Sequence, residues 1–131
     1  MDVSFVASRE IASRDRPGFT AGVLPAACPS RTVLDHVTSK WGVLVIVALS
    51  GETLRWGELR RVVEGISEKM LAQTLRVLER DGFVRRQSHG TVPPRVEYSL
   101  TARGDELAAR LLPLLEWVAD NADAVLAGRE A

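Results

Sequence analysis

The most informative stretch of this chain is residues 65–82, which read GISEKMLAQTLRVLERDG. Ser67 is a residue type that caps helix N-termini, and Glu68 adds negative charge in the first turn, where the helix dipole favours it. Gly82 is the residue type that most often follows a helix C-terminus. At 100° per residue, one face of this segment is apolar and comprises Leu71, Leu75 and Leu78. The stretch therefore predicts a capped amphipathic helix over about residues 67–81.

The opposite face of this predicted helix is basic and rich in hydrogen-bond donors. It carries Lys69, Gln73, Arg76 and Arg80. An α-helix fits the major groove of B-DNA, where Lys, Arg and Gln bond to guanine and adenine edges. We therefore expect Lys69, Gln73 and Arg76 to read bases, with Met70 and Thr74 among the DNA-contacting residues. Ser67 and the free amides at the helix N-terminus suit a phosphate.

Several shorter elements are predicted before this helix. Ser30–Thr38 has a short amphipathic helical pattern. Trp41–Leu49 is apolar on every side, so periodicity alone does not separate a buried helix from a buried strand. Its length, between a serine and a glycine, favours a helix. Leu54–Arg55 then makes a short extended piece, and apolar residues at helical spacing in 56–63 predict a brief helix.

Two strands and a long helix are predicted after the capped helix. Phe83–Ser88 and Arg95–Leu100 have strand patterns, and the proline-containing connection between them should project as the tip of a ribbon. Thr101 caps a final helix that Pro113 should kink or divide. The fold class is therefore mainly α with a small β-ribbon (α+β), and the order of elements is that of a winged helix-turn-helix.

The predicted ribbon, or wing, adds further basic residues. They are Arg85, Arg86, His89 and Arg95. Outward arginines are often only solvated surface, but these lie on one ribbon beside one basic helix face. We expect Arg86, His89 and Arg95 to contact phosphates or enter the minor groove.

Length and charge agree with such a domain. The 131 residues, 46% of them hydrophobic, suit one globular domain, and 17 basic and 17 acidic side chains give no net charge. The charge is nevertheless uneven. Residues 54–103 hold ten basic and six acidic side chains, a balance of +4, whereas residues 104–131 hold two and six, a balance of −4. This distribution favours an anionic partner for the middle of the chain.

Other function classes are not supported by the sequence. The longest apolar run, Val43–Leu49, is too short to span a bilayer, and charges near the N-terminus oppose a signal peptide, so we expect a cytoplasmic protein without membrane contact. One cysteine and two histidines, His36 and His89, make a disulfide framework or a zinc site improbable. Neither histidine belongs to a catalytic arrangement. We predict no metal, no cofactor and no enzymatic activity.

The chain resembles the HxlR family of bacterial transcriptional regulators, which are related to the MarR-like regulators. The resemblance covers about residues 28–118 and rests on these segments: Cys28-Pro29, Lys40-Trp41, Arg55-Trp56-Gly57-Glu58-Leu59-Arg60-Arg61, Gly65-Ile66-Ser67-Glu68-Lys69-Met70-Leu71, Leu75-Arg76-Val77-Leu78-Glu79 and Pro93-Pro94-Arg95-Val96-Glu97-Tyr98-Ser99-Leu100-Thr101. It implies a homodimer formed by the first and last helices. It further implies that about 67–81 is the recognition helix and about 83–100 the wing.

The apolar face of the last helix agrees with a homodimer, because it is larger than so short a chain readily buries alone. The residues expected at the dimer interface are Leu34, Leu107, Leu111, Leu114, Leu115 and Trp117. A symmetric dimer predicts an inverted-repeat operator in double-stranded DNA with half-sites one turn apart. We expect a flexible arm over 1–27, the DNA-binding and dimerisation domain over 28–120, and the end of the last helix or a tail over 121–131.

Two alternatives remain open. In the first, DNA binding is the output of a sensor that responds to an oxidant or a small molecule. Cys28 precedes a proline and a predicted helix N-terminus, which favours the reactive thiolate, and some members of the resembled family sense oxidants through a cysteine here. The simpler interpretation, which we favour, is that Cys28 is a small buried hydrophobic residue at the dimer interface. A small molecule could instead bind among the tryptophans at the dimer centre. In the second alternative, the same basic face binds an acidic protein surface.

Overall fold

The computed structural model describes residues 23–129, so most of the expected N-terminal arm and residues 130–131 lie outside the described part of the chain. The chain divides into two compact units, residues 1–35 and 36–131. In the described part of the first unit, turns and bends precede helix α2 (Pro29–Val37), whose last two residues belong to the second unit. Proline suits the start of α2 because amides in the first turn lack an intrahelical acceptor.

The second unit continues with the helices α3 (Lys40–Ala48), α4 (Trp56–Val62) and α5 (Glu68–Arg80). The apolar segment whose periodicity was ambiguous is thus a helix, as its length favoured. Ser39 caps α3, since its hydroxyl oxygen accepts a hydrogen bond from the Gly42 amide at 3.1 Å. Ser67 caps α5 in the same way, by accepting from the Met70 amide at 3.1 Å. The predicted start of the basic helix is therefore confirmed.

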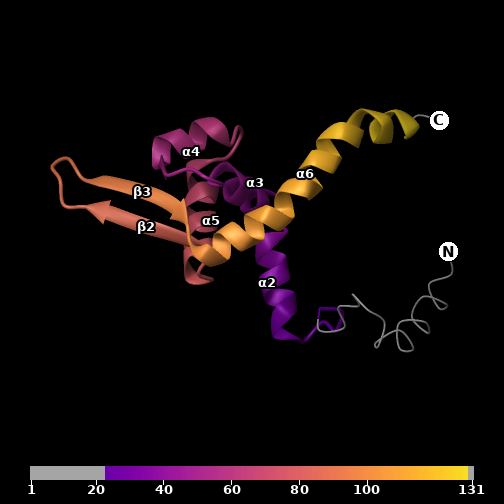
Figure 1. Cartoon of the computed structure of the whole chain (residues 1–131), viewed down its shortest axis with the longest axis horizontal. Helices are drawn as coiled ribbons and strands as arrows, with labels where there is room; N and C mark the ends of the chain where they lie inside the picture. The colour runs from indigo at the N-terminus through magenta and orange to yellow at the C-terminus, as the bar shows by residue number, and fades with distance from the viewer. Residues whose placement is uncertain (1–22, 130–131) are drawn as a thin grey trace. The chain divides into compact units, whose positions relative to one another are not determined.

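Within residues 23–129 the strands form one antiparallel sheet in the order β1-β3-β2, with β1 (Leu54–Arg55), β2 (Val84–His89) and β3 (Arg95–Leu100). The sequence predicted the β2–β3 ribbon but not the pairing of the extended piece with it. A strand of two residues shows no alternation, and β1 is defined by its partners on β3, Tyr98 and Glu97. Figure 1 shows the β2–β3 hairpin projecting beyond α4 and α5.

Helix α6 (Ala102–Gly128) begins directly after β3. Thr101 caps it as predicted, accepting a hydrogen bond from the Gly104 amide at 3.1 Å. Gly104 allows the helix to approach the sheet closely, because a Cβ at this position would lie 2.1 Å from the carbonyl oxygen of Phe83. The helix continues through Pro113 without dividing.

The core of the second unit lies where α3, α4, α5, the sheet and the first half of α6 meet. Its largest fully buried side chains are Val45, Ile46, Leu49, Leu59, Leu71 and Leu78. Each such side chain stabilises the fold by roughly 1.5–3 kcal/mol relative to exposure. The buried leucines of α5 therefore anchor this helix in the core. None of the described helices is long and apolar enough to cross a bilayer.

Candidate nucleic-acid interface

The exposed face of α5 is the first part of the candidate interface. The burial of its leucine stripe determines which side of the helix faces solvent. Ser67, Lys69, Gln73 and Arg76, all predicted to contact DNA, are exposed on the other side. Within residues 23–129, no carboxylate lies within ion-pair distance of Lys69 or Arg76. This face therefore offers unneutralised cations and an amide to a ligand.

Two predicted contact residues on α5 lie elsewhere. Thr74 is only 9% exposed, because its spacing of three and four residues from Leu71 and Leu78 places it on the buried stripe. The expectation that Thr74 contacts DNA is thus corrected: it belongs to the core. Met70 is half-buried and packs against the core, leaving part of its side chain at the surface.

The turn between α4 and α5 positions the start of the basic helix. Gly65 has a φ of +88°, a backbone conformation that glycine adopts without the steric penalty of a side chain. Across the turn, the guanidinium of Arg60 on α4 lies 3.3 Å from the carboxylate of Glu68 on α5. Both side chains are exposed, so this ion pair is weak. Arg60 was not among the predicted site residues, because its partner Glu68 lies on a different helix.

The wing separates the predicted contact residues onto two faces. Directly opposite residues in an antiparallel pair project to the same face of the sheet. His89 pairs with Arg95, whereas Arg86 pairs with Tyr98, which is buried. Arg86 is exposed but lies on the face that carries the core side chains further along the hairpin. The structure therefore brings His89 and Arg95 together and separates Arg86 from them.

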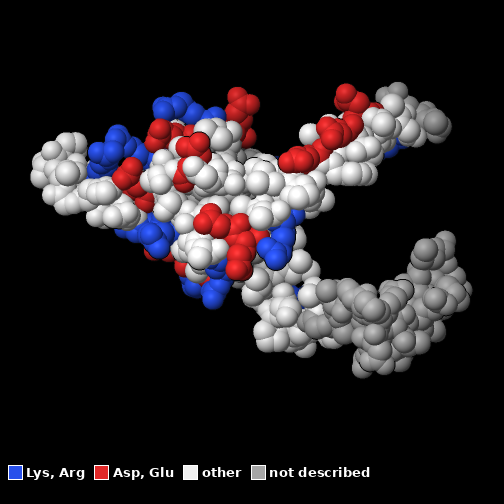
Figure 2. Space-filling view, in the orientation of Figure 1, with Lys and Arg blue, Asp and Glu red and all other residues white. Residues whose placement is uncertain are grey.

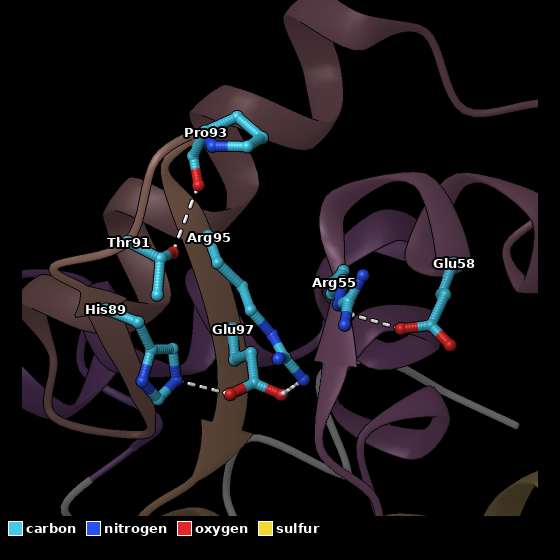
Figure 3. A network of polar contacts seen from close by, with 7 residues as sticks. All are labelled: Arg55, Glu58, His89, Thr91, Pro93, Arg95 and Glu97. Atoms are coloured by element: carbon cyan, nitrogen blue, oxygen red, sulfur yellow. Dashed lines mark hydrogen bonds and ion pairs between the residues drawn. The ribbon is translucent and has the colours of Figure 1, made fainter.

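Glu97 connects His89 and Arg95 on the outer face of the wing (Figure 3). One carboxylate oxygen of Glu97 hydrogen-bonds to the His89 ring, and the other lies 3.7 Å from the Arg95 guanidinium. Near the tip, the Thr91 hydroxyl donates to the Pro93 carbonyl at 3.0 Å. Glu97 was not among the predicted contact residues, although its position two residues after Arg95 on the predicted strand places both side chains on one face of the sheet.

Charge is distributed unevenly over the second unit. Figure 2 shows Lys and Arg side chains over the hairpin and α4, and acidic side chains along the outer part of α6. The acidic side chains of that part of α6 are Glu116, Asp120 and Asp123, all exposed. The outer part of α6 therefore carries three of the six acidic side chains of residues 104–131.

The residues expected at a dimer interface fall into two groups. Leu111 is buried in the core, and Leu107 and Leu115 are half-buried, so these three serve the fold of one chain at least in part. Leu114 and Trp117 are 52% and 58% exposed. Further along α6, the exposed large apolar side chains also include Val118, Val125 and Leu126. In the first unit, Leu34 is half-buried.

Cys28 and His36, the two remaining candidates, occupy different units. Cys28 is half-buried just before α2, and the nearby Arg31 guanidinium donates to the Leu24 carbonyl at 3.3 Å. His36 hydrogen-bonds through Nδ1 to Asp81 at 2.6 Å, and Asp81 is the C-cap of α5. Among the residues that the structure describes, no three His, Cys, Asp or Glu side chains are grouped as metal ligands would be.

Comparison with known proteins gives a consistent result. The family model described as HxlR-like helix-turn-helix matches residues 36–125. The uncharacterized HTH-type transcriptional regulator YtfH of Escherichia coli is 52% identical over 103 residues, which cover 79% of this chain and 82% of that protein. The similarly described YybR of Bacillus subtilis is 41% identical over 97 residues, covering 73% of this chain and 77% of that protein.

Solved structures agree with the sequence relatives. The putative transcriptional regulator ytfH from Salmonella typhimurium has a TM-score of 0.77 and 52% identity, with 82% of this chain and 96% of that chain covered. The redox regulator HypR in its oxidized form has a TM-score of 0.67 and 38% identity, with coverage of 72% and 97%. The reduced form of YodB from B. subtilis has a TM-score of 0.61 and 32% identity, with coverage of 70% and 90%.

Proposed function

We propose that this chain, a transcriptional regulator that belongs to the HxlR-like helix-turn-helix family, binds an inverted-repeat operator in duplex DNA as a homodimer. The observation that carries the proposal is the two-sided character of α5. Its leucines are buried, and its opposite face exposes Lys69, Gln73 and Arg76. In the major groove these side chains would bond to base edges, while Ser67 and the adjacent amides contact a phosphate.

The wing supports a second contact with the same duplex. The exposed guanidinium of Arg95 and the half-buried ring of His89 lie on one face of the hairpin, and Arg86 lies on the other. Such a hairpin would place His89 and Arg95 against phosphates or in a minor groove beside the groove that α5 enters. We assign the chain no cofactor and no enzymatic activity, and place its action in the cytoplasm, where a bacterial chromosome lies.

The exposed apolar side chains of α6 support the homodimer. Leu114, Trp117 and Val118 form a surface of large apolar side chains within two turns of one helix. A second copy of this helix would cover that surface in a two-fold symmetric contact. The two α5 helices would then enter the major groove about 34 Å apart, one turn of B-DNA.

Selection of bound sites from a random duplex pool, at near-physiological salt, tests the proposal. The expected product is an inverted repeat with half-sites one turn apart. A salt titration on the selected site should weaken binding by orders of magnitude from low to moderate salt, because phosphate contacts release counterions. A folded protein that enriches no sequence, and that instead captures an acidic protein surface, would overturn the proposal in favour of an interaction module.

A second candidate function, redox sensing through Cys28, is favoured by the similarity to the solved redox regulator HypR, at 38% identity. With one cysteine per chain, a disulfide would join Cys28 to a second subunit or to a small thiol. Diamide or peroxide should then reduce operator binding of the wild type and leave Cys28→Ser unchanged. Equal loss of binding in both proteins would refute the sensor.

A further inference from the structure

A groove runs between the start of α4 and the outer face of the wing. It consists of two adjoining depressions of about 530 and 590 Å³, which share Arg55, Gly57 and Arg95. The first is also lined by Thr53, Glu58, Arg61 and Glu97, and the second by Trp56, Thr91, Val92, Pro93, Pro94 and Val96. The elements that form the groove are thus β1, α4, β3 and the tip of the wing.

One end of the groove is cationic. Arg55, Arg61 and Arg95 all line it and are all exposed. In the part of the chain that the structure describes, neither Arg55 nor Arg61 has an ion-pair partner. The two carboxylates in the same depression are already engaged by protein groups: Glu58 accepts a hydrogen bond from the Arg55 amide at 2.8 Å, and Glu97 contacts His89 and Arg95 (Figure 3).

The other end of the groove is apolar and stiff. Val92 is 98% exposed at the tip of the wing, and two prolines follow it. Such side chains have no hydrogen-bonding capacity, so they suit the carbon atoms of a ligand and not its charged groups. A ligand that fits the whole groove therefore presents anionic and apolar groups next to each other, along an extended and open path.

We propose that this groove holds a stretch of the DNA sugar-phosphate backbone, with phosphates on Arg55, Arg61 and Arg95 and deoxyribose against Val92, Pro93 and Pro94. The inference rests on the proposed DNA binding and extends it to residues on β1 and α4. Phosphate is the group that arginine bonds best, through its fork of donors.

Arg61→Gln is the informative variant, and Arg110→Gln, an exposed arginine of α6 outside the groove, is its matched control. Binding is measured against salt on the selected operator and on an unrelated duplex of equal length. One lost phosphate contact lowers the slope of log affinity against log salt by about 0.9, which corresponds to about fivefold weaker binding at 0.15 M salt. We expect this loss on both duplexes for Arg61→Gln and none for Arg110→Gln.

The outcomes separate this inference from the proposed function. A wild-type protein that binds no duplex at all refutes both. A wild type that binds normally, with an unchanged salt slope for Arg61→Gln, refutes the groove alone. Inorganic pyrophosphate tests a free anion as the occupant: saturable binding that Arg61→Gln abolishes, with no change in the DNA slope, would show a small-molecule site and overturn the inference.

Discussion

Gln73 and Arg95 represent the two kinds of contact in the proposed complex. Gln73 is exposed on α5 and can bond to an adenine edge, which only some base pairs offer. Arg95 is exposed on the wing and lines the groove. The phosphates that it would contact are present in every DNA sequence. The two side chains therefore contribute differently to specificity and to affinity, although both lie on the surface of the same unit.

This difference is measurable. Gln73→Ala should reduce the discrimination between the operator and a duplex with one altered half-site base by about 1–3 kcal/mol. Arg95→Ala should weaken binding to all duplexes by a similar factor and lower the salt slope by about 0.9. Binding titrations of both variants on both duplexes separate a loss of discrimination from a uniform loss of affinity. The reverse pattern would contradict the assignment of α5 as the base reader and of the wing as the phosphate contact.

Gly104 is a single-residue constraint on the fold. Because an added Cβ would lie 2.1 Å from the Phe83 carbonyl oxygen, Gly104→Ala should force α6 away from the sheet and cost about 1–3 kcal/mol of unfolding free energy. Urea unfolding measures the change. Gly128→Ala, at a glycine of the same helix with no atom within 4 Å of the added Cβ, should not destabilise the protein. If the two variants were equally stable, α6 would not pack against the sheet as closely as the Gly104–Phe83 approach indicates.

At the scale of elements, the proposed function requires α5 to remain anchored while its outer face contacts DNA. Leu75, at 3% exposure, is on its buried face. Leu75→Ala should lower the unfolding free energy by about 2–5 kcal/mol, because it removes buried contacts and leaves a cavity. Gln73→Ala, two residues earlier on the exposed face, should change it by less than about 0.5 kcal/mol. A small effect of Leu75→Ala, measured by thermal or urea unfolding, would contradict the anchoring role.

The elements that could be predicted are those with a long repeating pattern. The caps Ser67 and Thr101 and the leucine stripe of α5 follow from residue type and spacing, and the structure has them. The pairing of β1 with β3 could not be predicted, because two residues carry no period and their partners lie more than 40 positions later. Thr74 is buried because of its spacing from Leu71 and Leu78, although threonine is a polar residue type.

The same limit applies to the candidate site. Lys69, Gln73 and Arg76 share one helix, so their common face follows from helical geometry. Arg55, Arg61 and Arg95 come from different elements, and only the folded chain places them around one depression. The sequence showed that the middle of the chain is basic, but not which of its arginines are neutralised by a neighbouring carboxylate.

At the scale of the whole molecule, the assignments depend on two-fold symmetry. An acidic outer α6, with Glu116, Asp120 and Asp123 exposed, would be repelled by phosphates and therefore suits a position away from the duplex. The apolar side chains of the same helix suit a contact with its symmetry mate. The paired α6 helices would then direct both α5 helices toward DNA, while the negative charge of α6 would keep it away from the DNA backbone.

Trp117→Glu tests this arrangement, because a carboxylate at a 58% exposed position costs the single chain little but would be buried without a partner in a symmetric interface. We expect sedimentation to show a dimer for the wild type and a monomer for the variant, which should still unfold cooperatively but at a lower Tm, because dimerisation stabilises the folded state by mass action. Ala119→Glu adds the same group to an exposed position about 200° around the same helix from Trp117, and should remain dimeric.

The operator provides the second half of that test. Insertion of about five base pairs between the half-sites rotates one of them by half a turn, so a rigid dimer can no longer contact both. Wild-type affinity should fall toward that for a single half-site, whereas Trp117→Glu should bind both operators equally and weakly. A variant that stays dimeric, or a wild type that tolerates the insertion, would contradict an α6 interface, because only a fixed separation of the two α5 helices makes the spacing matter.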